Sequence, residues 1–297
     1  ANLKVTDWLT LQARGNLDYS ADKLRQKFYA STATALCGMN GRYIEMDYQE
    51  TQMYGDVMAM VKKQLNDFTL DVAIGGSIND RITNSTRIDS KNASLKYANV
   101  FNLANIVMSS SASIDQKIDA HYQLQSVFAT AQIGYKEGVF LDLTARNDWS
   151  STLAYTKYEK KGFFYPSVGV SFLPDKWVKM PEWVSFSKLR GAYSIVGNGV
   201  PPFITYPVSY VTAGGEILAS DAAPFAEMKP EMTHSVELGM EWKFLQHRLG
   251  LNLTYYRTDT YEQFFKLPAL AGDKYAYRYV NAGDIRNQGC LLYTSPS

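Results

Sequence analysis

A few residues have types and spacings that could support catalysis. Asp142 and Asp148 would share one face of a strand, as would Glu237 and Glu241, and paired carboxylates can act as general acid and base. The sequence contexts that accompany catalysis are missing, because the chain has no G-x-S-x-G, H-E-x-x-H or P-loop motif. The run 197–199 (GNG) suits a turn and does not continue into a phosphate cradle. We therefore expect neither an enzyme nor a bound cofactor.

The composition gives no support to metal, disulfide or nucleic-acid chemistry. The three histidines are scattered, and neither Cys37 nor Cys290 has a CxxC partner. The 30 Lys and Arg against 29 Asp and Glu leave a net charge of +1, which provides no basic patch for a nucleic acid. The unusual feature is aromatic content, with 21 Tyr, 14 Phe and 5 Trp in 297 residues. Ring faces suited to binding are therefore the strongest chemical signal.

The elements that must position these residues are strands, because apolar side chains recur at every second position. Val236, Leu238 and Met240 alternate with polar residues, and after a short turn the pattern resumes at Leu249 and Leu251. The same alternation runs through 9–17, 68–74, 127–135, 139–145 and 164–172. We predict about ten strands and no transmembrane helix, since no stretch approaches 18 apolar residues.

The connections between these strands alternate between two lengths. Short turns are predicted near residues 66, 137 and 247, with a longer one at 174–184. Long polar stretches separate them, at roughly 20–50, 85–116, 198–232 and 257–276, with a shorter one at 152–163. Several loops this long are rare in a compact soluble domain, whereas outer-membrane barrels combine short periplasmic turns with long external loops.

The two faces of each predicted strand also suit a barrel. One face is aliphatic and aromatic and would meet lipid, while the other is charged or small and would meet a wet lumen. Tryptophans at strand ends suit the membrane interface. We predict this interfacial position for the four tryptophans beside the short turns and for one at the opposite end of its strand: Trp8, Trp177, Trp183, Trp242 and Trp149. The alternative is that they are core aromatics of a soluble β protein.

Several stretches resemble one family when they are taken in order. They are 143–152 (LTARNDWSST), 164–172 (FYPSVGVSF), 188–198 (KLRGAYSIVGN), 228–241 (MKPEMTHSVELGME), and 251–256 (LNLTYY) followed by 281–289 (NAGDIRNQG). Their order and spacing are similar to the later barrel region of the SusC/RagA branch of the TonB-dependent outer-membrane transporters. Each motif alone is weak, but five in order are specific. The resemblance covers nearly the whole chain and is clearest from about residue 120 to 289.

The resemblance implies an all-β fold, an antiparallel transmembrane β-barrel section that is incomplete. The family has a 22-stranded barrel, preceded by a plug and by the segment that engages TonB. Residues 1–289 would then form roughly half a barrel domain, with the plug and the final strands outside the chain. It further implies import of glycan oligosaccharides or peptides with a SusD-like lipoprotein as lid, in contact with outer-membrane lipid. We expect that this piece alone cannot transport.

The last eight residues, 290–297 (CLLYTSPS), depart from the family pattern. They resemble the translation of a transposase adapter used in sequencing libraries, and we expect them to be a non-native tail. The alternative is a genuine short strand and turn.

Two residue sets are candidates for function. Aromatics in the predicted external loops suit contact with a sugar ring or with the lid: Tyr155, Tyr158, Phe203, Tyr206, Tyr210, Tyr261, Tyr275, Tyr277 and Tyr279. Charges on the polar strand faces would face the lumen or the plug: Arg14, Asp71, Asp142, Arg146, Arg190, Glu237 and Glu241. Loop-on-loop packing for the aromatics and cross-strand pairing for the charges are the structural alternatives.

Two other functions remain open at this point. A soluble glycan-binding β protein would fractionate without detergent. A passive porin or adhesin barrel would lack an N-terminal plug, which the gene upstream of Ala1 would reveal.

Overall fold

The computed structural model describes residues 1–91, 95–107, 113–211 and 217–296. Strands dominate it, and three single-turn 3₁₀ helices lie at Leu103–Asn105, Ser151–Leu153 and Pro174–Lys176. Among these residues, no helix has the length and apolar character needed to cross a membrane.

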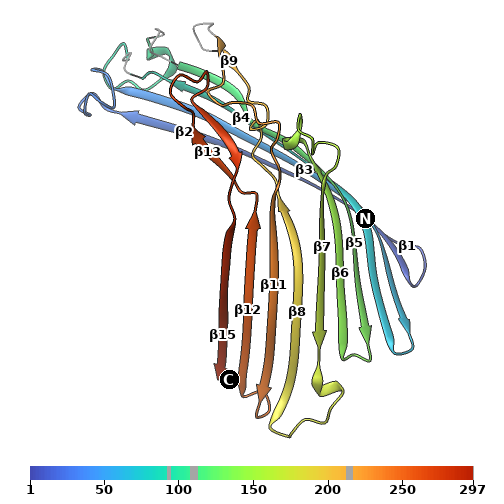
Figure 1. The fold of residues 1–297 in the computed structure, drawn as a ribbon. Coiled ribbons are helices and arrows are strands. Elements are labelled where there is room, and N and C mark those ends of the chain that lie inside the picture. Colours follow the sequence, from blue (N-terminus) through green and yellow to red (C-terminus); the bar gives the residue numbers. More distant parts are fainter. Residues whose placement is uncertain (92–94, 108–112, 212–216, 297) are drawn as a thin grey trace.

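One antiparallel sheet of 11 strands forms the body of the molecule (Figure 1). In spatial order its strands are β1 (Asn2–Lys4), β2 (Leu9–Phe28), β3 (Arg42–Leu65), β4 (Phe68–Asp89), β5 (Ser113–Tyr135), β6 (Val139–Ser150), β7 (Phe163–Phe172), β8 (Val184–Asn198), β11 (Glu231–Phe244), β12 (Leu249–Tyr261) and β15 (Ile285–Pro296). Two ribbons lie in the connections: β9 (Tyr210–Val211) with β10 (Ile217–Leu218), and β13 (Phe264–Pro268) with β14 (Tyr277–Asn281). The described sheet is open, with β1 and β15 at its edges, which confirms an incomplete antiparallel barrel section.

Short turns join the strands at one end of the sheet, where they were predicted. Asn66 follows β3 with φ of 52°, and Lys136 and Glu137 follow β5 with φ of 48° and 52°. The turn after β3 has two residues and the turn after β5 has three, and both lengths are common in hairpins that contain left-handed residues. The hairpins therefore close tightly at this end and leave the long connections at the other.

The strands β2 to β5 are much longer than a membrane requires. They contain 20, 24, 22 and 23 residues, whereas a transmembrane strand needs about 9–11. The expected loops at 20–50 and 85–116 are therefore wrong in extent, because β2 continues to Phe28, β3 begins at Arg42, β4 reaches Asp89 and β5 starts at Ser113. Figure 1 shows these strands reaching beyond the ends of β6, β11 and β12. We name these outer parts of β2–β5 the strand extension.

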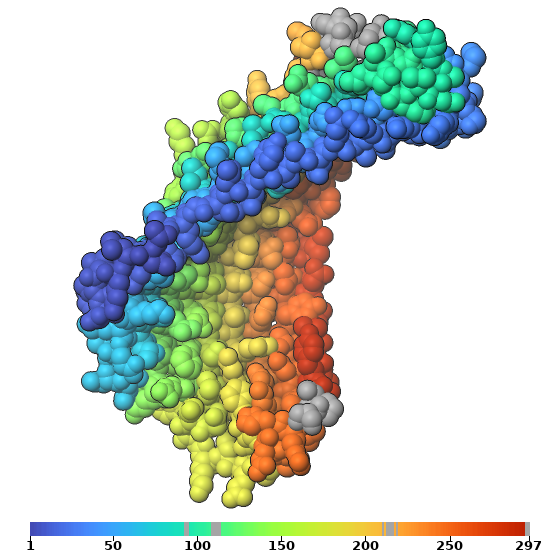
Figure 2. All heavy atoms as spheres, turned by 180° about the vertical axis from the view of Figure 1, so that it is seen from behind, coloured from blue at the N-terminus to red at the C-terminus, as the bar shows by residue number. Residues whose placement is uncertain are grey.

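Burial on the two faces of the sheet is inverted relative to a soluble protein. Register pairs Leu11 with Ala59, Ala59 with Ile74 and Ile74 with Ala129, so one face carries a continuous apolar surface, and Ile74 is 57% exposed. The opposite face buries polar groups such as Asp56. In a curved sheet the side chains of the concave face crowd together while those of the convex face spread apart. Figure 2 shows β2, in blue, crossing in front of the yellow-to-red strands as the sheet curls.

Two small hydrophobic clusters organise the external connections. Leu153, Phe163, Val200, Ile204 and Met228 join the connections after β6, β8 and β10. Tyr43, Leu95 and Ile106 anchor the connection between β4 and β5 onto β3. The external loops therefore have cores of their own, away from the sheet's apolar face.

Candidate functional site

All seven predicted lumen charges lie on the same face of the sheet. Arg14 is opposite Asp56 on β3, Asp71 is opposite Gln132 on β5, and that glutamine is opposite Asp142 on β6. The register continues in the same way to Arg190 and to β11, and residues directly opposite in a pair of strands point to one side. The seven are listed by strand as Arg14 (β2), Asp71 (β4), Asp142 and Arg146 (β6), Arg190 (β8), and Glu237 and Glu241 (β11). We name this side the polar face; its assignment to a lumen stays a prediction.

Most of these charges have partners within the wall. The Nε of Arg14 donates to both carboxylate oxygens of Asp56 at 3.1 and 3.0 Å, and the Asp56 side chain is fully buried. Asp71 pairs with Lys62 at 2.9 Å, and Asp142 accepts from Gln132 at 2.7 Å.

The remaining charges of the polar face differ in their pairing. Arg146 donates to Asp148 at 2.6 Å, and Glu241 lies 3.6 Å from the Nζ of Lys243. Glu237 makes no hydrogen bond or ion pair with any residue in the described part of the chain. Pairing inside the wall thus accounts for Arg146 and Glu241, while the lumen-facing or plug-facing role of Glu237 stays a prediction.

Arg190 depends on a glycine across the strand pair. Its Nη2 donates to the hydroxyl of Thr254 at 2.7 Å, and it reaches there by crossing over Gly239. A Cβ added at Gly239 would lie 2.3 Å from the Nε of Arg190. The missing side chain therefore makes the room that this arginine occupies.

Three of the predicted loop aromatics come together in an external cleft of about 370 Å³. Tyr155 and Tyr206 pack at 5.0 Å between ring centroids, and Phe203 lies beside them. Both tyrosines are exposed, at 71% and 58%. Exposed aromatic rings suit planar or apolar ligand surfaces. We name this site the aromatic cleft.

The strand extension supplies the other wall of the aromatic cleft. The carboxylate of Asp80 on β4 accepts from the amide of Gln123 at 3.1 Å and lies 3.5 Å from the Nε2 of His121. Tyr122 completes this wall. These four residues were absent from the predicted set, which held only aromatic residues of the expected loops at this end of the molecule. They belong to β4 and β5, where these strands pass beyond the end of β6.

The other predicted aromatics are dispersed. Tyr158 and Tyr279 pack against the loop cluster around Leu153, so they contribute to loop packing. Tyr261 lies on β12 with its ring edge-on to His234 at 5.2 Å. Tyr277 is covered by the Nζ of Lys266 at 3.5 Å from its centroid, and it contacts Tyr279.

The last two predicted aromatics lie in the external connections. Tyr275 is partly buried, and its amide donates to Asp273 at 3.4 Å. Tyr210 lies in β9, with its side chain outside the described residues.

Aromatic residues gather at the short-turn end of the sheet. Trp177 packs on Tyr135 at 5.5 Å, and Trp183 stacks on Phe244 at 5.6 Å. Trp242 contacts that same phenylalanine, and Trp8, directly before β2, is exposed.

Trp149 lies at the opposite end of the sheet, on β6. Its Nε1 donates to the carbonyl of Lys160 at 3.2 Å. This arrangement suits interfacial anchoring at both ends, and the interfacial role of the tryptophans stays a prediction.

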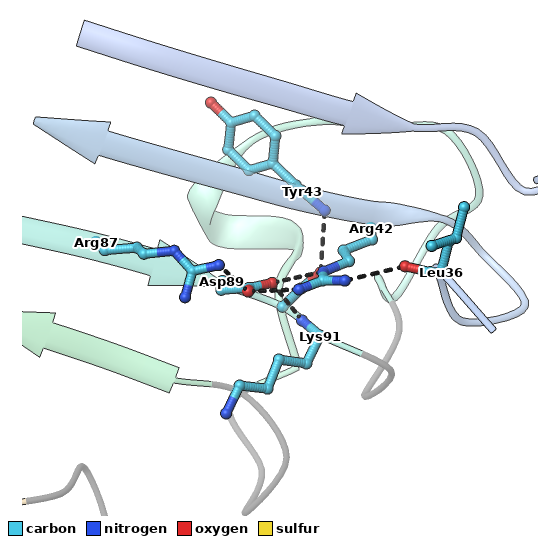
Figure 3. Close-up of polar contacts among 7 residues, drawn as sticks. Leu36, Arg42, Tyr43, Arg87, Asp89 and Lys91 are labelled. Atoms are coloured by element: carbon cyan, nitrogen blue, oxygen red, sulfur yellow. Dashed lines mark hydrogen bonds and ion pairs between the residues drawn. The ribbon is translucent and has the colours of Figure 1, made fainter. Parts of the chain in front are cut away.

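A buried carboxylate fixes the far end of the strand extension, as Figure 3 shows. Asp89 accepts from Arg42 through Nε at 2.8 Å and Nη2 at 2.7 Å, from Arg87 at 2.7 Å and from the amide of Lys91 at 2.8 Å. Arg42 also donates to the carbonyl of Leu36 at 3.1 Å. The network joins β3 and β4 to the connections on either side, and we name it the Asp89 network.

Hydrogen-bond donors and basic groups of the strand extension keep two of its carboxylates ionised. The pKa of Glu45 is lowered to about 2, mainly by the hydrogen bond from Lys23 at 2.7 Å and by that from the hydroxyl of Tyr43. Burial raises the pKa of Asp89, but hydrogen bonds from Arg42 and from the amide of Lys91 outweigh it and leave the pKa lowered. Both groups are anionic at neutral pH.

Comparison with known proteins decides the family. The model of the TonB dependent receptor-like β-barrel matches residues 2–290. The chain belongs to this family. The match ends at the first residue of the expected non-native tail. Residues 290–296 are the second half of β15, paired with Leu249–Tyr255, and their origin stays a prediction.

Similar proteins give the same picture. The TonB-dependent receptor P3 of Formosa agariphila is 25% identical over 177 residues, which cover 56% of this chain and 17% of that receptor. The RagAB peptide transporter superposes with a TM-score of 0.82 at 19% identity, covering 99% of this chain and 33% of that one. The ferric-catecholate import receptor Fiu of Escherichia coli K12 gives 0.57 at 12% identity, covering 99% and 43%. The chain therefore spans less than half the length of these relatives.

These findings confirm the resemblance to SusC/RagA-like TonB-dependent receptors and the outer-membrane location. The soluble alternative fails, because the family is built from transmembrane barrels whose apolar side faces lipid.

Proposed function

We propose that this chain forms part of the barrel wall of an outer-membrane importer that takes up nutrients under the control of TonB. The observation that carries the proposal is the burial of the sheet, which is inverted relative to a soluble protein. One face is apolar and exposed, and the other carries paired charges, in a chain that belongs to the TonB-dependent receptor family. Half a wall cannot close a lumen, so uptake belongs to the full-length receptor.

We further propose that the imported nutrient is an oligosaccharide or a peptide and that a SusD-like lipoprotein covers the external end. The aromatic cleft supports this ligand class, because Tyr155 and Tyr206 offer exposed rings in the external connections, 5.0 Å apart and tilted by 39° to each other. Sugars stack on such rings, and peptide side chains and amides find both apolar and acceptor groups there.

The test is uptake by cells that carry the full-length receptor. Labelled oligosaccharide and peptide pools are offered to cells with and without TonB and with and without the neighbouring lipoprotein. We expect uptake of one pool and its loss in both deletions. Uptake that persists without TonB would favour the passive porin alternative. The isolated chain reconstituted in vesicles should show no selective flux.

The contribution of the aromatic cleft is tested separately with the variant Tyr155→Ala/Tyr206→Ala. It should weaken substrate binding about tenfold or more, because each ring contributes roughly 0.5–1.5 kcal/mol beyond its buried area. Phe265→Ala, at an exposed aromatic outside the cleft, is the matched control. Unchanged binding by the double variant, with correct membrane insertion, would remove the cleft from the substrate path.

A further inference from the structure

The apolar face has a border where its lipid-facing residues end, and on two neighbouring strands, β12 and β15, that border carries an arginine. On β12, Leu249, Leu251, Leu253 and Tyr255 share the apolar face, and the next residue on that face is Arg257. A strand needs about 9–11 residues to cross the hydrocarbon. Since β12 begins at Leu249 beside a short turn, Arg257 lies at the level where lipid headgroups begin on the external side.

Arg257 belongs to a compact cluster on this face. Its Nε donates to Asp259 at 2.9 Å, and the Nε of Arg286 on β15 donates to the same carboxylate at 2.5 Å. Asp259 is itself directly opposite His234 on β11 and opposite Arg286 on β15. One carboxylate thus holds two guanidinium groups side by side, and the three groups together carry a net charge of +1.

Most N–H donors of the two arginines make no hydrogen bond to another residue in the described part of the chain. Each guanidinium has five N–H groups, and only the one at Nε donates to Asp259. Their side chains are 40% and 54% exposed, whereas Asp259 is only 14% exposed. A carboxylate that needed neutralising would be satisfied by one arginine. The second one and the outward terminal nitrogens make a fork suited to a tetrahedral anion.

Aromatic groups flank this fork on the same face. The hydroxyl of Tyr193 and the Nδ1 of His234 are 2.8 Å apart, and Tyr261 packs edge-on against that histidine. Along β4 and β5 the corresponding border is formed by Asp80 and Gln123, which give no positive charge. On β12 and β15 this border carries arginines, next to His234 on β11.

We propose that Arg257 and Arg286 bind the phosphate of a phosphorylated lipid of the outer leaflet. The charge of the fork complements a phosphate, and the apolar residues Leu253 and Tyr255 directly beneath it would contact the acyl chains. A free phosphate ion would use only the fork, whereas a lipid uses both the fork and the apolar face. The proposal rests on the outer-membrane location and is independent of which nutrient the receptor imports.

The test uses the full-length receptor in nanodiscs of neutral phosphatidylcholine, titrated with diphosphoryl lipid A and followed by native mass spectrometry. Arg257→Gln/Arg286→Gln should weaken lipid A binding about tenfold or more. Monophosphoryl lipid A should bind the wild type more weakly than the diphosphoryl form. Arg248→Gln, at the exposed short-turn end of the same hairpin, is the control and should bind like the wild type.

Two results would overturn the proposal. One is a double variant that binds diphosphoryl lipid A as tightly as the wild type. The other is full displacement of the lipid by millimolar inorganic phosphate, which would assign the fork to a free anion. If the double variant fails to reach the membrane, Arg286→Gln alone should still weaken binding about threefold to fivefold, and wild-type affinity would count against the site.

Discussion

Replacing Asp89 with Asn should release the connections that the Asp89 network holds. The buried carboxylate accepts four hydrogen bonds, three of them from arginine nitrogens. Removing one partner of a buried ion pair costs about 3–5 kcal/mol. Because the side chains of Arg42 and Arg87 are 22% and 36% exposed, water compensates them in part and we expect the lower end, about 3 kcal/mol.

The loss should appear as local opening, because the network lies at the end of the strand extension. Hydrogen exchange in the full-length receptor measures this opening at the amides of Lys96 and Tyr97. The amide of Lys96 donates to the main-chain carbonyl of Asn105 at 2.8 Å, and the amide of Tyr97 donates to the side-chain oxygen of Asn105 at 2.9 Å. A change of about 3 kcal/mol corresponds to roughly 150-fold faster exchange.

Asp47→Asn is the matched control, since this carboxylate is also on the strand extension but is 47% exposed in its pair with Lys23. It should accelerate exchange less than about fivefold. Exchange of Lys96 and Tyr97 within twofold of wild type in Asp89→Asn would refute the reasoning. The double variant Arg42→Gln/Asp89→Asn should be less destabilised than the sum of the single variants, because the two charges are coupled.

Three further predictions address the pH response, the apolar face and the polar face. The pKa of Glu45 is about 2 in the folded protein against 4.5 ordinarily, so its carboxylate is fully ionised and stabilising at neutral pH. Amide protection in the strand extension should therefore fall as the pH is lowered from about 4.5 to 2. A loss of protection already at pH 6 would contradict this. Ile74→Arg, near the middle of the apolar band, should reduce the free energy of folding from urea into bilayers by about 2–4 kcal/mol. Ala73→Arg on the polar face should cost much less. Equal costs would contradict the assignment of the two faces to lipid and lumen. Gly239→Ala should push Arg190 from Thr254 and lower the urea midpoint. Gly15→Ala on β2, whose added Cβ would meet no atom nearer than 4.0 Å, is the control for an added methyl group in a strand. Equal midpoints for Gly239→Ala and wild type would contradict the packing.

The sequence predicted the membrane part of the sheet well, because lipid on one side imposes alternation there. Val236, Leu238 and Met240 follow this period, and the structure places them on one face of β11. The strand extension escaped prediction for the same physical reason. Both of its faces meet polar surroundings, so residues such as Glu45 and Glu50 on β3 show no apolar period even though they are paired on both sides.

The candidate site was partly predictable. Tyr155 and Tyr206 were found because exposed loop aromatics stand out in the sequence, but their partner Asp80 was not, since it comes from a distant strand. The contact between Arg42 and Asp89 is likewise long-range, and only the register of β3 and β4 brings the two residues together. Pairings of this kind depend on tertiary structure, which local sequence patterns do not contain.

The strand extension has a consequence for how receptors of this kind diverge. Within the lipid band, each outward position of a strand must stay apolar, so selection restricts half of the residues. In the extension the main-chain hydrogen bonds continue, and away from the buried residues of the Asp89 network and of the cluster around Tyr43 neither face requires a particular residue class. Substitutions there can accumulate without altering the path of the backbone. This is the part of the wall where a lineage can change what the cell surface presents to nutrients, phages or antibodies while the membrane insertion of the barrel is preserved.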